Sequence, residues 1–221
     1  MDWIKGKIIK TYQSAGDMKS VVVKTDEKFD FRPGQHFELC IPGSSVIRKY
    51  SVVSSMYSND KNLEFGIQLI PGGALSPKLW ELKEGDEIEL RGPLGRSFVW
   101  DSTNSGPLVL IGAGSGITPL LSIYDSYRHD YPQGECVFIM SAKDSSRVMK
   151  YDEIKSFLTT RFTSTEGRIN SDFLKNHIGN LATNKNTMCY ICGPDNFIDD
   201  VVDMVSDMGI SDDNIKSERF I

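Results

Sequence analysis

A glycine-rich turn in the middle of the chain constrains its fold more than any other feature. A strand-like apolar run over residues 108–111 leads into Gly112, Gly114 and Gly116, and Pro119 follows where a helical pattern begins. Glycine allows positive φ angles and a close backbone approach to a ligand, and proline is favoured in the first turn of a helix. The segment therefore predicts a strand, a tight turn and a helix whose free N–H groups suit an anionic phosphate.

The turn matches no established phosphate or nucleophile motif in full. The dinucleotide fingerprint G-x-G-x-x-G/A fails at Ile117, and the P-loop pattern lacks a lysine after the last glycine. The hydrolase elbow G-x-S-x-G fails at Ala113. Two interpretations remain open, a nucleotide site and a purely structural strand-to-helix turn.

The second half of the chain alternates between strand and helix patterns. The expected strands cover residues 108–111, 136–140, 160–163 and 188–192, and the expected helices cover 119–128, 151–158, 171–176 and 196–208. In the last helix Phe197, Val201, Val205 and Met208 recur at helical spacing. This order predicts an α/β domain with a parallel sheet over residues 107–221.

The first half follows the period of two that is typical of strands. Short alternating runs cover residues 21–23, 35–41, 63–69 and 87–90, with turn residues between them. We expect residues 1–100 to form an antiparallel β-barrel, in which closure pairs the strand edges. The polar stretch 101–106 is the expected linker, so the predicted fold is a β-barrel domain followed by an α/β parallel-sheet domain.

Composition excludes several classes of function. A net charge of −5 gives no basic surface for nucleic acid, and no apolar run approaches the ~20 residues of a membrane span. The N-terminus lacks the apolar core of a signal peptide, so a cytoplasmic location is expected. The C-x-x-C pair Cys189 and Cys192 lies in an apolar strand-like run, which favours buried thiols, and the isolated histidines predict no metal site.

Four further motifs accompany the glycine turn in a fixed order. They are Arg32-Pro33-Gly34-Gln35, Arg48-Lys49-Tyr50-Ser51, Gly72-Gly73-Ala74-Leu75-Ser76 and Cys192-Gly193-Pro194. Together they make the chain resemble the ferredoxin–NADP⁺ reductase family over essentially its whole length. The resemblance implies a flavin-binding barrel followed by a nicotinamide-binding α/β domain.

The resemblance assigns flavin roles to the motif around Tyr50. Arg48 would contact the diphosphate, Tyr50 would lie against the isoalloxazine, and Ser51 would donate or accept a hydrogen bond near the reactive N5. Alternate strand residues share a face, so Arg48 and Tyr50 can point at one ligand. The alternative is a solvent-facing arginine and a packed tyrosine.

The second glycine motif is a candidate nest for the flavin diphosphate. Gly73, Ala74 and Ser76 offer backbone N–H groups and a hydroxyl at the start of a helical turn, which favours FAD over FMN. A glycine turn capped by Ser76 is the structural alternative.

On the nicotinamide side, the resemblance implies that Gly114 and Gly116 lie beside the cofactor diphosphate and Thr118 near the nicotinamide. Cys192, Gly193 and Pro194 follow a predicted strand at the carboxyl edge of the sheet, where ligands bind in open α/β folds. The Cys192 thiol would lie near the nicotinamide C4, or it would be a buried structural thiol.

Two more segments complete the expected site. Arg147 lies in the region that the family uses for the adenosine ribose, where it could hold the 2′-phosphate of NADPH, in preference to NADH. At the C-terminus, Phe220 would shield the flavin and Glu218 would bond the active-site thiol or hydroxyl. A terminal strand that tucks Phe220 into the core is the alternative. The expected catalytic residues are Ser51, Cys192 and Glu218.

The resemblance implies an FAD-dependent NAD(P)H oxidoreductase that reduces a separate protein, such as a ferredoxin or an oxygenase component. No plant-type iron–sulfur motif is present in the sequence. Two alternatives stay open: a reductase of free flavin or another small acceptor, and a non-catalytic flavin subunit of a larger complex.

Overall fold

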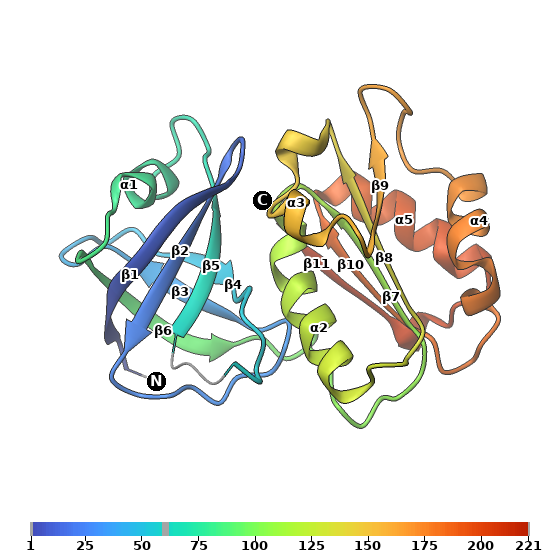
Figure 1. Ribbon diagram of the computed structural model, residues 1–221, viewed down its shortest axis with the longest axis horizontal. Helices are drawn as coiled ribbons and strands as arrows, with labels where there is room; N and C mark the ends of the chain where they lie inside the picture. Colours follow the sequence, from blue (N-terminus) through green and yellow to red (C-terminus); the bar gives the residue numbers. More distant parts are fainter. Residues whose placement is uncertain (1, 59–61, 221) are drawn as a thin grey trace.

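The protein is described by a computed structural model that covers residues 2–58 and 62–220, and it contains two sheets, one in each half of the chain (Figure 1). The predicted architecture is confirmed, with an antiparallel barrel-like sheet followed by a parallel α/β sheet. No helix within the described residues is long and apolar enough to cross a membrane.

The first sheet has six strands in the order β4-β3-β6-β1-β2-β5. Its elements are β1 (Ile4–Ala15), β2 (Met18–Thr25), β3 (His36–Cys40), β4 (Arg48–Ser51), β5 (Asn62–Gln68), the short helix α1 (Ser76–Glu81) and β6 (Glu87–Leu94). An antiparallel bridge between Val52 and Phe65 links the two outer strands and closes the sheet into a barrel. Phe37 and Phe65 meet edge to face in its core.

Strand β1 was not predicted from the sequence. Its pairing with β2 shifts register between Ile8 and Lys10 and again between Gln13 and Ala15. Each irregularity moves the following side chains to the other face of the strand, so the alternation of apolar residues is broken. The longest strand of the barrel therefore carries the weakest period-two signal.

The second sheet is parallel, with the order β11-β10-β7-β8-β9. Its elements are β7 (Leu108–Ala113), α2 (Ile117–Asp130), β8 (Cys136–Ala142), α3 (Tyr151–Ile154), β9 (Leu158–Phe162), α4 (Ser171–Ala182), β10 (Met188–Gly193), α5 (Asp195–Asp207) and β11 (Ile215–Arg219). The strand order reverses at β7, which lies between β10 and β8, so the turn after β7 is at a topological switch point.

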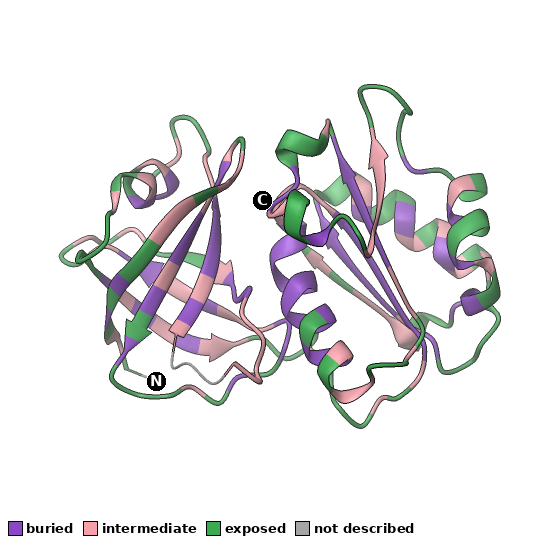
Figure 2. Ribbon diagram, viewed as in Figure 1, coloured by how far each residue is buried: buried purple, intermediate pink, exposed green. Residues whose placement is uncertain are grey.

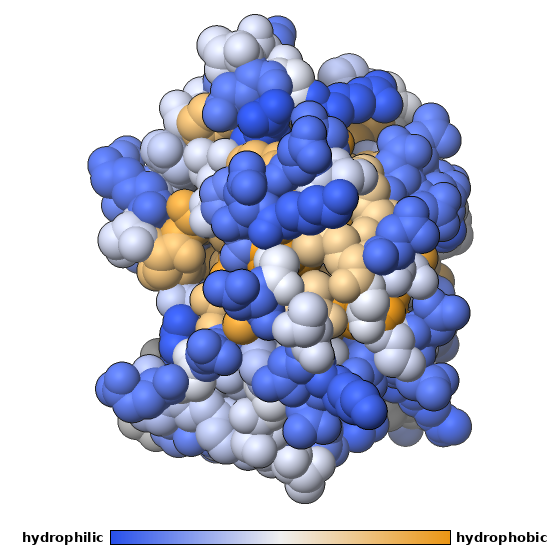
Figure 3. Space-filling model, turned by 90° about the vertical axis from the view of Figure 1, so that its right-hand side faces the viewer, coloured by the Kyte–Doolittle hydropathy of each residue, from blue (hydrophilic) through white to orange (hydrophobic). Residues whose placement is uncertain are grey.

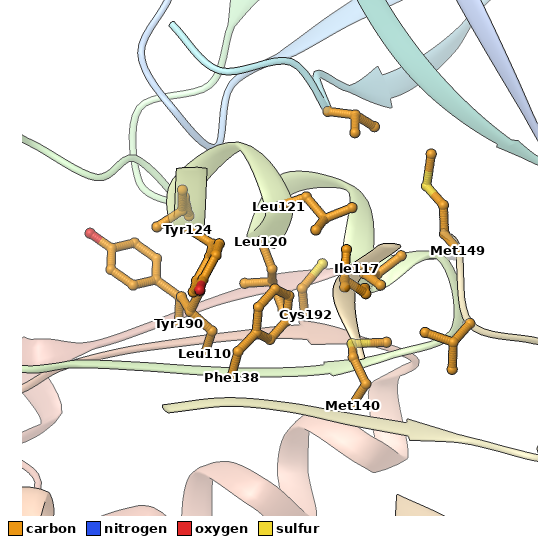
Figure 4. Packing of buried hydrophobic residues seen from close by; sticks show 14 of the residues in the cluster. Leu110, Ile117, Leu120, Leu121, Tyr124, Phe138, Met140, Met149, Tyr190 and Cys192 are labelled. Carbon is orange, nitrogen blue, oxygen red and sulfur yellow. The ribbon is translucent and has the colours of Figure 1, made fainter. Parts of the chain in front are cut away.

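Helix α2 covers the face of the parallel sheet that is turned toward the barrel. Leu120 and Tyr124 of this helix lie over Phe138 and Tyr190 of the sheet (Figure 4). Helices α4 and α5 cover the opposite face, where Ile178 and Val201 join a separate apolar cluster. Figure 2 shows the resulting buried layers, with α2 the most buried helix of the domain.

The segment between the sheets belongs by packing to the second one. Phe98 and Trp100 are buried in the cluster under α2, and Trp100 meets Tyr127 edge to face. Met18 and Val53 of the barrel enter the same cluster. The two domains therefore share apolar core, although the boundary at 101–106 stays a prediction.

The expected helix over 151–158 is wrong beyond Ile154. Helix α3 is a single turn, and Lys150 before it adopts a left-handed conformation at φ 55°. The ring of Phe157 leaves the helical path and stacks on Tyr124 of α2, with 4.3 Å between ring centroids. This tertiary contact overrides the local helical pattern.

Candidate active site between the domains

Two of the three glycines in the first turn, Gly114 and Gly116, serve different structural needs. A side chain at Gly116 would place its Cβ 2.1 Å from the carbonyl oxygen of Cys192, so the turn lies directly against β10. Gly114 has φ +56°, and a Cβ there would meet no atom within 4 Å. Gly116 therefore allows close packing, whereas Gly114 leaves an open backbone surface beside the N-terminus of α2.

Thr118 lies in the contact between the domains. Its hydroxyl donates to the carbonyl of Ser115 at 2.9 Å, which fixes the end of the turn. Its Cγ2 approaches Gly66 of β5 so closely that a Cβ at Gly66 would lie 2.5 Å away. Since this side chain is buried, the glycine turn is held against the barrel wall.

Cys192 and Glu218 are neighbours at the carboxyl edge of the sheet. They are register partners in the parallel pair β10 and β11. The Cys192 side chain is buried beneath α2 (Figure 4), and burial, reinforced by the charge of Glu218, raises the pKa of its thiol well above the usual value. The sulfur is therefore a neutral thiol near pH 7.

Glu218 is a partly buried carboxyl group with unsatisfied hydrogen-bonding capacity. Burial raises its pKa to about 7, against an opposing effect of the Lys49 charge. Among the described residues its buried Oε2 has no hydrogen-bond partner. A buried acceptor of this kind is costly unless a ligand or water satisfies it.

His36 connects this pair to the barrel. Its Nδ1 lies 3.8 Å from Oε1 of Glu218, and it is the register partner of Ser51 in the pair β3 and β4. Burial lowers the pKa of His36, and Lys49 lowers it further. Burial therefore disfavours charge on both partners of the histidine–glutamate contact.

The contact between His36 and Glu218 links the strand pairs that carry the three predicted catalytic residues, whose catalytic role stays a prediction. Ser51 and His36 come from the barrel, and Glu218 and Cys192 come from the parallel sheet. Sequence reasoning missed His36 and Lys49. The only signal for either was strand register, which a single sequence does not reveal.

Arg48 and Tyr50 lie on the same face of β4, as expected for residues two apart. The Arg48 side chain is exposed, and its Nη1 donates to the carbonyl of Ile47 at 2.7 Å. The Tyr50 ring packs partly against the barrel core, and burial raises the pKa of its phenol to about 12 despite the nearby Arg48. Arg48 is thus accessible to a ligand, and the Tyr50 ring is accessible in part.

The second glycine motif forms a compact turn. The N–H of Gly73 donates to the carbonyl of Ile70 at 2.9 Å, and the N–H of Ile70 donates to the hydroxyl of Ser76 at 3.1 Å. A Cβ at Gly73 would lie 2.9 Å from the Ile70 oxygen. The capped-turn interpretation therefore accounts for Gly73 and Ser76, while Ala74 and the start of α1 remain candidates for a phosphate contact.

Arg147 is already engaged by the barrel. Its Nη1 lies 2.8 Å from Oδ2 of Asp17 in the turn between β1 and β2. Two backbone bonds hold the same loops together, from Gly16 to Ser146 at 2.6 Å and from Lys150 to Ser14 at 2.7 Å. A 2′-phosphate would have to compete with Asp17 for this guanidinium.

The C-terminal residues are compatible with both interpretations of the tail, as a cover for the flavin and as a strand that packs Phe220 against the core. The N–H of Phe220 donates to the carbonyl of Gly193 at 3.0 Å, and its ring packs against the cluster that contains Cys192. The tail continues the line of β11 and reaches the predicted site. Gly193 is tightly enclosed, with a built Cβ only 2.9 Å from Phe197, and Pro194 precedes α5.

The residues present fit a flavin and a nicotinamide nucleotide. The unpartnered Oε2 of Glu218 marks a place where a ligand polar group would be stabilised. The open backbone at Gly114 and the partly exposed ring of Tyr50 provide a surface for phosphate and one for a flat ring.

Comparison with known proteins agrees with this geometry. Residues 6–99 match the family model "Oxidoreductase FAD-binding domain", and residues 110–203 match "Oxidoreductase NAD-binding domain". The reductase component of propane 2-monooxygenase from Mycolicibacterium smegmatis is 32% identical over 83% of this chain. The ferredoxin–NAD(P)⁺ reductase component of the naphthalene 1,2-dioxygenase system from Pseudomonas putida is 25% identical over 98%.

The chain spans 58% and 69% of the lengths of these two relatives. Among solved structures, a cytochrome P450 reductase from Amycolatopsis superposes with a TM-score of 0.83 at 24% identity. The superposition covers 99% of this chain and 70% of that protein, and it shows a shared fold.

Proposed function

Because the chain belongs to the ferredoxin reductase-like family of FAD- and NAD-binding oxidoreductases, we propose that it carries electrons from NADPH or NADH through bound FAD to a separate electron-acceptor protein. The observation that carries the proposal is the group of residues at the interface. Glu218, the register partner of Cys192, lies 3.8 Å from His36, which is the register partner of Ser51 in the barrel.

In this proposal the barrel binds FAD. Arg48 would neutralise the diphosphate and Tyr50 would cover one face of the ring system. The turn that Gly73 and Ser76 stabilise would offer further phosphate contacts at Ala74 and the start of α1. Bound FAD would supply the redox chemistry, since a flavin can take up a hydride equivalent and release electrons singly or in pairs.

The parallel sheet binds the nucleotide. The turn at Gly114 and Gly116, with the N-terminus of α2, would hold the diphosphate, and Thr118 would lie toward the nicotinamide. The small, neutral Cys192 thiol admits the nicotinamide without blocking it. Gly193 and Pro194 end β10 at the same edge and shape the pocket wall.

Four side chains control protons and water at the reacting centre. Ser51 offers a hydroxyl, and Glu218, whose pKa of about 7 lies near neutrality, can hold or release a proton through contact with His36. Phe220 packs beside Cys192 and limits access of water to the site.

The acceptor in this proposal is a ferredoxin or an oxygenase component, by analogy with the named roles of the two relatives. NADPH is the proposed donor, with Arg147 at its 2′-phosphate. The four cysteines carry no disulfide, the usual state in a reducing cytoplasm, which is the proposed location.

The test is anaerobic reduction of the purified protein by NADH and by NADPH, followed by flavin absorbance and then by a panel of acceptors. We expect bleaching of the flavin band and faster reoxidation by an iron–sulfur protein than by free flavin. Preferential turnover of free flavin would identify a small-acceptor reductase. Absence of bleaching with either nucleotide would contradict the proposal and favour a non-catalytic flavin subunit.

A further inference from the structure

A cavity lies between the domains, apart from the group of residues described above. It has a volume of about 490 Å³, within the range of small-molecule sites. Barrel strands β2 and β5 form one wall, and α2 with the segment 150–157 forms the other. It is lined by Val22, Val53, Ser54, Ser55, Ser58, Asn62, Glu64, Leu121, Asp125, Lys150, Glu153, Ile154 and Phe157.

None of the residues predicted for the flavin or nicotinamide site lines this cavity. A tight contact between Gly66 of the barrel and Thr118 at the start of α2 marks the part of the interface that lies toward the glycine turn. The cavity borders the middle of α2, at Leu121 and Asp125. It is therefore a separate feature of the interface.

The shape of the cavity is fixed by bonds along α2. The connection between β4 and β5 runs beside the helix, where Ser122 donates to the carbonyl of Ser54 at 2.8 Å. Farther along, the Tyr57 hydroxyl donates to Asp130 at 2.7 Å, and its ring stacks on His129 at 3.8 Å. These contacts hold the two walls apart at a defined spacing.

Four charged side chains line the cavity, and only two of them, Lys150 and Glu64, pair with each other. Lys150 lies 2.7 Å from Glu64, and Tyr12 donates to the other oxygen of Glu64 at 2.7 Å. Asp125 lines the cavity near this pair, on the exposed side of α2, and it has no hydrogen-bond or ion-pair partner among residues 2–58 and 62–220. Reduced solvation beside the cavity wall raises the pKa of Asp125 to about 6. The charge of Lys150 opposes this shift, and the charge of Glu64 reinforces it.

The remaining walls supply apolar surface for a ligand body. Leu121, Ile154 and Phe157 present hydrocarbon next to Asp125, and the exposed Glu153 adds a second carboxylate at the rim. Within the described residues no set of three histidine, cysteine or acidic groups is placed to hold a metal ion. The chemistry of the lining therefore matches a cation that carries an apolar group.

We propose that this interdomain cavity binds a small organic cation, with its ammonium group paired to Asp125 and its apolar body against Leu121, Ile154 and Phe157. Such a ligand would contact both domains at once. Its binding would stabilise the domain arrangement shown in Figure 1.

The test is calorimetric titration of the full flavin-bound chain at pH 7.5 with 2-phenylethylamine, and separately with its uncharged analogue 2-phenylethanol. We expect saturable binding of one amine per chain and at least roughly tenfold weaker binding of the alcohol. Asp125→Asn should weaken the amine by roughly tenfold and leave the alcohol unchanged, because it removes only the charge.

Asp203→Asn, at an exposed position on α5, is the matched control and should bind the amine like the wild type. Val22→Trp, which fills the cavity from β2, should abolish binding of both compounds. Equal affinity for amine and alcohol, no saturable amine binding, or unchanged amine binding in Asp125→Asn would each overturn the proposal. These readouts do not depend on catalysis, so they are independent of the proposed reductase activity.

Discussion

Glu218 shows how strongly one side chain depends on its surroundings. Its ordinary carboxyl pKa of 4.5 is raised to about 7 in the folded protein, chiefly by burial. The folded state therefore binds the proton more tightly than the unfolded state. The contribution of this group to stability is fully present below pH 4.5 and is lost as the pH rises to about 7.

We predict that Glu218→Gln abolishes this pH-dependent loss of folding stability, because glutamine does not ionise. From pH 4.5 to pH 8 the variant should gain up to about 3 kcal/mol in free energy of unfolding relative to the wild type, measured by urea denaturation at matched flavin content. The lowered pKa of His36 acts in the opposite direction, but His36 is present in both proteins. A difference that stays constant with pH would mean that Glu218 ionises like an exposed carboxylate.

Arg48 is the residue on which flavin affinity should depend most. Its side chain is exposed and bonded only to the adjacent carbonyl of Ile47 among the contacts described, so truncation costs the fold little. Arg48→Ala should weaken flavin binding tenfold or more, since a charge-assisted hydrogen bond contributes about 1.5–3 kcal/mol. Flavin fluorescence titration measures this affinity, and the exposed Arg168→Ala serves as the control. If Arg48→Ala binds flavin with wild-type affinity, Arg48 does not contact the flavin and is an ordinary surface residue.

At the scale of elements, the turn between β7 and α2 can pack against β10 only because Gly116 has no side chain. Gly116→Ala would force a Cβ against the backbone of Cys192, so we expect a loss of about 1–3 kcal/mol in free energy of unfolding. Gly179→Ala in α4 meets no atom within 4 Å and should gain about 0.5–1 kcal/mol. Urea denaturation compares the two, and equal stability would show that the turn can move away from β10.

Strand β11 is both an edge strand of the parallel sheet and the element that carries Glu218. It lies at the edge of the sheet and pairs only with β10 among the described strands, so its shortening leaves the inner strands paired. Deletion of residues 218–221 should preserve fold and flavin but slow flavin reduction, because Glu218 and Phe220 are lost. Circular dichroism and stopped-flow absorbance measure these effects.

Arg219→Ala provides the control for this deletion. It removes surface ion pairs to Asp195 and Asp199 and leaves Glu218 and Phe220 in the chain. Unchanged reduction kinetics after the deletion would remove the tail from the site. Loss of folding would show that its packing against the core is essential.

At the scale of the whole molecule, the turn between β1 and β2 of the barrel is bonded to the loop that follows β8 in the other domain. Asp17 pairs with Arg147, and two backbone bonds hold the loops together. If Arg147 binds a 2′-phosphate, Asp17→Asn should lower the KM for NADPH severalfold by releasing the guanidinium. Arg147→Ala should raise it, and the KM for NADH should stay nearly constant in both variants.

Steady-state kinetics with each nucleotide measure these constants. If the KM values for NADPH and NADH change in parallel, Arg147 stabilises the contact between the domains and does not bind the 2′-phosphate. Hydrophilic side chains cover much of the opposite face of the molecule, which Figure 3 shows. The interface is therefore where domain arrangement and nucleotide choice are coupled.

The sequence by itself determined the architecture and the approximate position of the site. Apolar residues at a period of two indicated the barrel, alternating strand and helix patterns indicated the parallel sheet, and the motifs at Arg48, Gly114 and Cys192 indicated the cofactors. These signals are local, because backbone conformation and side-chain facing repeat over a few residues.

Only the tertiary structure placed His36 beside Glu218, paired Asp17 with Arg147 and opened a cavity at Asp125. It also revealed β1, whose register shifts erase the alternation that identifies a strand. Each of these depends on strand register or on docking of the domains. Both are fixed by contacts between residues far apart in the chain, which no local pattern encodes.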